Sequence, residues 1–204
     1  MNDTLGCNSL NDYNLEVNLS YSDLVEYLIQ KYGAVNGDYF VNESCTTKNK
    51  KISRTKEGLQ IHHIDEDKAI SLSQDTYAKT HPFSYQKAER LVYCNILEHL
   101  LLHIKIVEKS REEGINRNEL AGIGGAVCML CPQINDYYNG LIPKQEWRAN
   151  VMRVIEDSFD NYIMILRYFW NVIQHDQSYC FQIRKKDLSK DYSGNVVKKI
   201  FELL

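Results

Sequence analysis

The sequence predicts an α+β fold, in which two short strands precede a long helix and the C-terminal half is mostly helical. Apolar residues alternate in the segment 59–64, the segment 90–94 is a second short candidate strand, and apolar residues recur at three- and four-residue steps from residue 96 onward. The 204 residues are 44% hydrophobic and 25% charged, with only three prolines. This composition is typical of an ordered globular protein with a sizeable core.

The first predicted helix lies near the N-terminus. Ser20 is a suitable N-cap, Leu24 and Leu28 follow at helical spacing, and Gly33 closes the segment. We therefore expect residues 1–44 to form a helical lead to the rest of the chain.

Two strands and a helix are predicted in the middle of the chain. Residues 59–64 alternate as a strand that ends in two histidines, and residues 90–94 form a second short strand. The polar connection 65–87 is longer than most loops, which indicates a functional or locally helical segment. Asn95 is then expected to cap a helix that runs over 96–113.

The C-terminal region, residues 115–204, is expected to be helical. A long helical stripe of apolar side chains crosses it, which we interpret as core or as the seam of a homodimer. Its members are Trp147, Val151, Val154, Ile155, Tyr162, Leu166, Phe169 and Ile173.

The charge distribution singles out one basic segment. The formal net charge of −3 argues against a protein that coats nucleic acid by bulk charge. Residues 47–56, however, carry five basic and no acidic side chains and directly precede the predicted strand with two histidines. A solvated loop and an arm that contacts nucleic-acid phosphates both remain open. The arm consists of Lys48, Lys50, Lys51, Arg54 and Lys56.

Neither a membrane span nor a secretion signal is predicted. No apolar run approaches about 18 residues, and residues 1–18 are acidic and polar. The six cysteines are irregularly spaced, unlike a compact disulfide framework. We therefore expect a cytoplasmic protein with reduced thiols and no membrane partner.

Four of the six histidines form two pairs that predict a metal site. His62 and His63 end the first strand, while His99 and His103 lie four residues apart and so share one helix face. The helix pair with one strand histidine makes three ligands, which leaves positions for water and a phosphate oxygen. Neutral imidazole binds divalent metals such as zinc and nickel. A half-buried structural histidine pair is the alternative.

Such a site suits phosphodiester hydrolysis. The attacking water must lose a proton near neutral pH, for which a histidine with a pKa near about 6.5 is suited. Charge that builds on the phosphate and the leaving oxygen must be stabilised by a cation. One metal ion and one additional histidine meet both needs.

The order of these motifs resembles the HNH endonucleases, especially phage and mobile-element members. The matching residues are His-His-Ile, then Leu-Val-Tyr-Cys, then Glu-His-x3-His, within residues 58–107. The resemblance implies a small ββα-metal nuclease core at 45–114. It also implies that His62, His99 and His103 bind a divalent ion (Mg, Mn, Ni or Zn), that His63 is the general base, and that DNA, with RNA not excluded, is the substrate.

Two departures from the family pattern leave alternatives open. The family's middle Asn aligns with Arg90, which is expected to bind the scissile phosphate or to orient His63 through the strand backbone. Residues 65–67 are acidic, and we interpret them as a solvated turn in preference to an oxygen ligand. A catalytically inactive HNH-fold protein that binds nucleic acid or a partner is one rival hypothesis. A purely structural metal site, with His63 buried and hydrogen-bonded, is the other.

Overall fold

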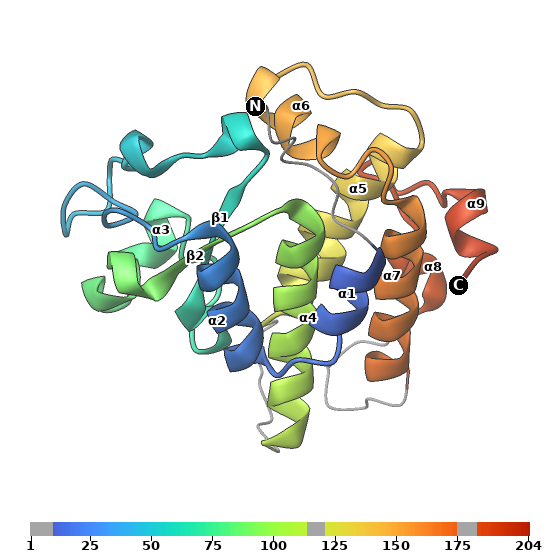
Figure 1. Ribbon diagram of the computed structural model, residues 1–204, viewed down its shortest axis with the longest axis horizontal. Helices are drawn as coiled ribbons and strands as arrows, with labels where there is room; N and C mark the ends of the chain where they lie inside the picture. Colours follow the sequence, from blue (N-terminus) through green and yellow to red (C-terminus); the bar gives the residue numbers. More distant parts are fainter. Residues whose placement is uncertain (1–9, 114–120, 175–182) are drawn as a thin grey trace.

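The computed structural model describes residues 10–113, 121–174 and 183–204. A central helix, α4, separates the two strands and α2 on one side from α5 and α7 on the other, and α6 lies above its upper end (Figure 1). The predicted α+β fold is confirmed. The helices are α1 (Leu10–Glu16), α2 (Tyr21–Tyr32), α3 (Asp75–Ala78), α4 (Ile96–Glu112), α5 (Cys131–Tyr138), α6 (Glu146–Arg153), α7 (Phe159–Ile173), α8 (Lys185–Leu188) and α9 (Lys198–Phe201). Shorter helical turns are η1 (Lys50–Ile52), η2 (Thr55–Glu57), η3 (Ile64–Asp67), η4 (Phe83–Gln86), η5 (Ala88–Arg90) and the π-helical η6 (Gly124–Leu130).

The two strands form an antiparallel pair. Strand β1 (Gln60–His63) pairs with β2 (Leu91–Cys94), so that His62 lies opposite Val92 and His63 opposite Leu91. Because successive side chains of a strand point to opposite faces, the two adjacent histidines enter different environments. Both strands lie where the sequence predicted them.

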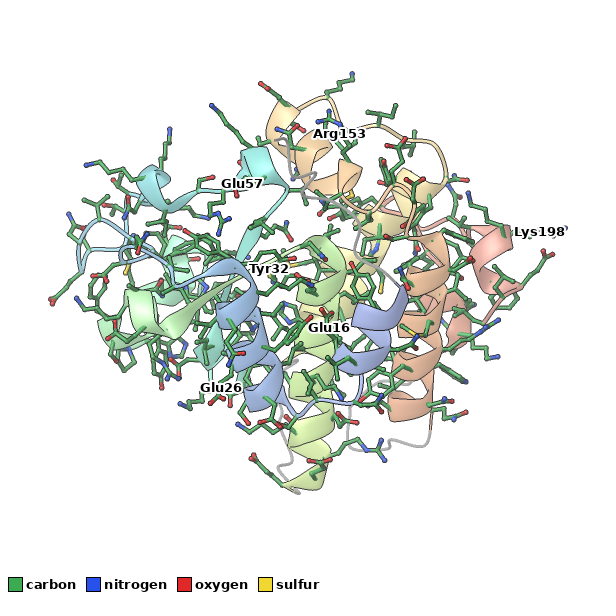
Figure 2. All side chains as sticks on the ribbon, in the orientation of Figure 1. Glu16, Glu26, Tyr32, Glu57, Arg153 and Lys198 are labelled. Atoms are coloured by element: carbon green, nitrogen blue, oxygen red, sulfur yellow. The ribbon has the colours of Figure 1, made fainter. Side chains whose placement is uncertain are left out.

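Helix α4 begins with a capping box. The Asn95 side chain accepts two backbone N–H groups of the first turn, and the Glu98 carboxylate accepts the Asn95 N–H. Lys31 donates to both Glu98 and Glu16, at 2.7 and 3.1 Å, and the Tyr32 hydroxyl donates to Glu98 at 2.9 Å. Glu16 on α1 and Tyr32 on α2 lie beside the upper part of α4 (Figure 2). These bonds fix the start of α4 directly before His99.

Helix α4 is buried on several sides because it belongs to two apolar clusters. Leu101, Leu102 and Ile106 pack with α2 and β2, while Leu100 and its helical neighbours pack with α5, α6 and α7. The larger cluster takes residues from all three predicted segments of the chain. The division into 1–44, 45–114 and 115–204 stays a prediction.

The C-terminal stripe differs from the predicted long helix. It forms two helices, α6 and α7, separated by tight turns at 154–158. The backbone N–H groups of Ile155 and Ser158 bond three residues back instead of four, and Ser and Asp side chains favour such turns over helix interiors. Trp147 is 46% exposed, so this end of the stripe lies outside the core. The homodimer stays a prediction.

The connection after β1 is locally helical, which is one of the two possibilities that the sequence predicted for residues 65–87. It contains η3, α3 and η4, and it folds back so that Gln86 returns to the strands. Within the described ranges, no helix has both the length and the apolar character needed to cross a bilayer.

Candidate metal centre

Three elements bring four potential ligands together. His62 at the end of β1, Glu66 in η3, and His99 and His103 on α4 each offer one ligand atom, and these atoms lie within 4.8 Å of one another. The three imidazole centroids are 5.0 to 5.2 Å apart. The structure therefore brings together the three histidines that the sequence singled out and adds Glu66.

The tautomer of His62 is set by Tyr21. The Tyr21 hydroxyl donates its one proton to the Ile64 carbonyl at 2.8 Å and lies 3.0 Å from His62 Nε2. Nε2 must therefore carry the proton and donate, which leaves the lone pair on Nδ1. His62 Nδ1 is buried and has no hydrogen-bond partner among the described residues, and it lies 3.7 Å from a Glu66 oxygen. An orphaned lone pair that faces a carboxylate and two imidazoles fits a metal ligand.

The two helix histidines present nitrogens to the same space. His99 Nδ1 donates to the Gln60 side-chain oxygen at 2.9 Å, so its Nε2 carries the lone pair. His103 Nε2 lies 3.4 Å from Glu66, and its Nδ1 is buried without a partner in the described part of the chain. Histidine ligands usually donate their second ring N–H to an oxygen, as His62 and His99 do here.

Burial keeps these imidazoles neutral. It lowers the pKa values of His62 and His99 well below their usual range, with the neighbouring histidines as a further cause, and lowers the pKa of His103 to about 4. Neutral imidazole is the form that binds metals. Burial also raises the pKa of Glu66 to about 8. A buried carboxylate is costly to ionise unless it is paired, so a cation at this point suits all four groups.

The acidic turn is not solvated, which corrects the interpretation of residues 65–67. Asp65 and Asp67 are buried, and Glu66 faces the histidines. Arg90 donates to Asp65 through Nε and Nη2, both at 2.6 Å, and Lys109 donates to Asp67 at 2.6 Å. These pairs hold η3 against α4 and against Arg90 at the end of η5 (Ala88–Arg90), which places Glu66. The sequence signal that could have identified Glu66 is its spacing of four residues from His62.

The Arg90 guanidinium is therefore paired with the Asp65 carboxylate. Its bidentate pair with Asp65 uses the planar fork that would otherwise bind a phosphate. Both roles predicted for Arg90, phosphate binding and orientation of His63, stay predictions.

His63 lies on the other side of β1 from the four candidate ligands. It is 1% exposed, and its Nε2 lies 2.9 Å from the side-chain oxygen of Gln86. The Tyr39 ring packs against it edge-on at a centroid distance of 4.4 Å. Burial lowers the pKa of His63 to about 4, partly offset by the Gln86 hydrogen bond. The base proposed from the resemblance is thus neutral at pH 7 and enclosed.

The residues of the basic arm have different environments in the structure. Lys48 lies over the Tyr39 ring, with Nζ 5.3 Å from the centroid, and its charge is one of the causes that lower the pKa of His63. Arg54 instead pairs with Glu57, donates to the Tyr32 carbonyl and lies over the Tyr93 ring. The other members, Lys50, Lys51 and Lys56, are exposed. Lys48 is therefore an arm residue that lies beside a neighbour of His63.

A glycine-containing helical segment covers His103. Gly125, in η6, lies so close to the ring that a Cβ built on it would overlap Cε1, Nδ1 and Nε2 of His103. Gly122 has a positive φ of 75°, and a Cβ built on it would clash with the His103 carbonyl oxygen. Segments of π-helix are frequent at functional sites, and this one fixes the orientation of a ligand ring.

The substitution Gly125→Ala is expected to displace the His103 imidazole and weaken metal binding by about 10- to 100-fold, the range typical of residues that orient a ligand. Isothermal titration with Zn²⁺ measures the change. Cys128→Ala, at an exposed position of the same segment, is the matched control and should bind as the wild type does. Equal affinities for the two variants would contradict the role of Gly125.

Comparison of the chain with protein-family models, with curated proteins and with solved structures gives no match. The functional argument therefore depends on the residues of the site.

Proposed function

We propose that this chain is a metal-dependent phosphodiester hydrolase of the HNH type, with a divalent ion held by His62, His99 and His103 and with Glu66 as an additional ligand. The observation that carries the proposal is the buried, unpartnered Nδ1 of His62 within 4.8 Å of the other donors. Three neutral imidazoles and a carboxylate are the donors that zinc and similar divalent ions prefer. The histidines of the site come from β1 and α4, and β2 pairs with β1 and directly precedes α4, an order that supports the ββα core implied by the sequence resemblance.

Each residue has a distinct part in the proposed reaction. The divalent ion stabilises negative charge on the phosphate when bound. His63 accepts the proton of the attacking water through Nδ1, because its Nε2 donates to Gln86. Lys48, beside Tyr39, attracts the phosphate backbone toward His63. Lys50 and Lys51 extend the same basic arm.

A nicking assay on supercoiled plasmid tests the proposal. Metal-stripped protein is supplied with Mg²⁺, Mn²⁺, Ni²⁺ or Zn²⁺, and single-stranded RNA is tested in parallel. We expect cleavage that depends on the added ion and disappears in His99→Ala and His103→Ala. If the stripped protein binds an ion tightly and cleaves neither DNA nor RNA with any of the four, the hydrolase proposal is wrong.

A structural metal centre is the second candidate, and two observations favour it. His63 is 1% exposed and hydrogen-bonded, as that hypothesis requires. With Glu66 the site also offers four protein ligands, the number found in closed structural zinc sites. Tight metal binding without cleavage would support this candidate. The inactive nucleic-acid-binding alternative instead requires DNA affinity without cleavage.

The basic arm supplies a separate prediction. Replacement of Lys48, Lys50 and Lys51 together by Gln is expected to weaken DNA binding and to flatten its dependence on salt. Each lost phosphate contact reduces the slope of log K against log salt by about 0.9, so the total change is at most about 3. Fluorescence anisotropy from low to moderate salt measures the slope.

Arg54→Gln is the comparison for this variant. Since Arg54 pairs with Glu57 and Tyr32, we expect it to change the stability of the arm and leave the salt slope unaltered. If the salt slope changes in Arg54→Gln and stays the same in the triple lysine variant, then Arg54, and not the lysines, contacts the phosphates.

A further inference from the structure

We propose that Gln86 is the residue that positions His63, by holding its ring with the proton on Nε2 and the lone pair on Nδ1. The inference rests on the proposed function for its catalytic consequence. The orientation itself follows from hydrogen bonds within the chain.

The direction of the Gln86 amide is fixed by its second bond. Its Nε2 donates to the Leu72 carbonyl at 3.1 Å, so its side-chain oxygen is the atom that faces His63. That oxygen can only accept, and His63 Nε2 must therefore donate at 2.9 Å. In a neutral imidazole the other nitrogen, Nδ1, then carries the lone pair. A single amide thus selects one tautomer of His63.

The backbone holds Gln86 in place. Its carbonyl accepts the N–H of Tyr39 at 2.7 Å, and the neighbouring Ala88 N–H donates to Asp38 at 3.1 Å. The Tyr39 ring in turn packs on His63. Gln86 is 0% exposed, so water does not compete for either of its side-chain bonds. The segments 38–39 and 86–88 therefore form a clamp around the imidazole.

The Arg90 guanidinium is bound to Asp65 at 2.6 Å through two nitrogens, whereas the Gln86 side chain contacts the His63 ring directly. The clamp comes from the long connection after β1, in which Leu72 supplies the anchor and Gln86 the contact. This unusually long connection therefore supplies the contact that orients the His63 ring.

Nitrogen-15 NMR of the histidine rings tests the tautomer directly, on full-length protein with and without Zn²⁺. In the wild type we expect His63 to be protonated at Nε2 and to lack a proton on Nδ1. In Gln86→Met, which is similar in length and has no amide, we expect a mixture of tautomers. Gln86→Glu keeps an acceptor oxygen and is expected to restore the Nε2–H form.

Kinetics and metal binding separate a positioning role from a general loss of structure. For Gln86→Met we expect kcat for plasmid nicking to fall by about 10- to 100-fold, which is less than the loss expected without a base, while KM and Zn²⁺ affinity stay unchanged. Gln74→Met, at an exposed position, is the matched control. Gln60→Met should instead weaken Zn²⁺ binding, because Gln60 accepts from His99.

A wild-type spectrum with the His63 proton on Nδ1 would overturn the inference, and this measurement remains valid even if Gln86→Met does not fold. An unchanged tautomer in folded Gln86→Met would overturn it as well. Absence of cleavage by the wild type would contradict the proposed function and would leave the tautomer measurement to judge the clamp.

Discussion

Replacement of His63 by alanine is expected to preserve metal binding and to slow phosphodiester cleavage by about 10²-fold or more, the usual scale for loss of a positioned general base. The side chain lies across β1 from the ligands and contacts Gln86 and Tyr39. Its removal therefore leaves the four donor atoms in place. Single-turnover cleavage at saturating DNA measures the chemical step, and Zn²⁺ titration measures the affinity for the ion.

His62→Ala is the matched variant, one residue away on the same strand. It removes the Nδ1 ligand atom and the hydrogen bond between His62 and Tyr21. We therefore expect metal binding and cleavage to be lost together. His81→Ala, outside the cluster, should behave as the wild type does. Wild-type cleavage by His63→Ala, with metal retained by His62→Ala, would mean that the roles of the two histidines are misassigned.

The strands and the central helix could be predicted because their patterns are local. Apolar alternation over 59–64 marks β1, a short run of apolar and aromatic residues marks β2, and apolar residues at three- and four-residue steps mark α4. Asn95 was recognisable as an N-cap, and its partner Glu98 completes the capping box. The same local pattern did not reveal the interruption at 154–158, because the apolar spacing continues across it while the backbone tightens.

The metal ligands could be predicted only in part. A four-residue histidine spacing on a helix fixes a shared face, and one strand histidine adds to it. Glu66 was missed because it lies in an acidic run whose most common environment is solvent. Its burial depends on two partners distant in sequence, Arg90 and Lys109, which bind the aspartates on either side.

The surroundings of His63 could not be predicted from the sequence. Gln86 lies 23 residues away in a segment without clear periodicity, and Tyr39 comes from the region before the basic arm. Composition likewise grouped Arg54 with the lysines, although Glu57 lies three residues away as a partner. Tertiary contacts decide the environment of His63, whereas a local ion pair distinguishes Arg54 from the lysines.

Removal of the metal ion is expected to destabilise the fold. The four donors connect β1, η3 and α4, and without an ion the buried Nδ1 of His62 has no hydrogen-bond partner among the described residues. An ion that binds only the folded state stabilises it by about 2.7 kcal/mol at a free concentration 100 times its Kd, and by about 4.1 kcal/mol at 1,000 times. Both the hydrolase and the structural centre require this linkage.

We therefore expect addition of a chelator to lower the midpoint of thermal unfolding by about 5 to 15 °C, given about 2 to 4 °C per kcal/mol for a chain of this size. Restored Zn²⁺ should reverse the change. In His103→Ala the midpoint should already be low and should respond little to chelator, because one donor is missing from the site. His81→Ala should respond as the wild type does. If the wild-type midpoint is the same with chelator and with excess Zn²⁺, Ni²⁺ or Mn²⁺, the four residues do not form a metal centre, and His62, Glu66 and His103 instead form a buried polar cluster held by protein contacts alone.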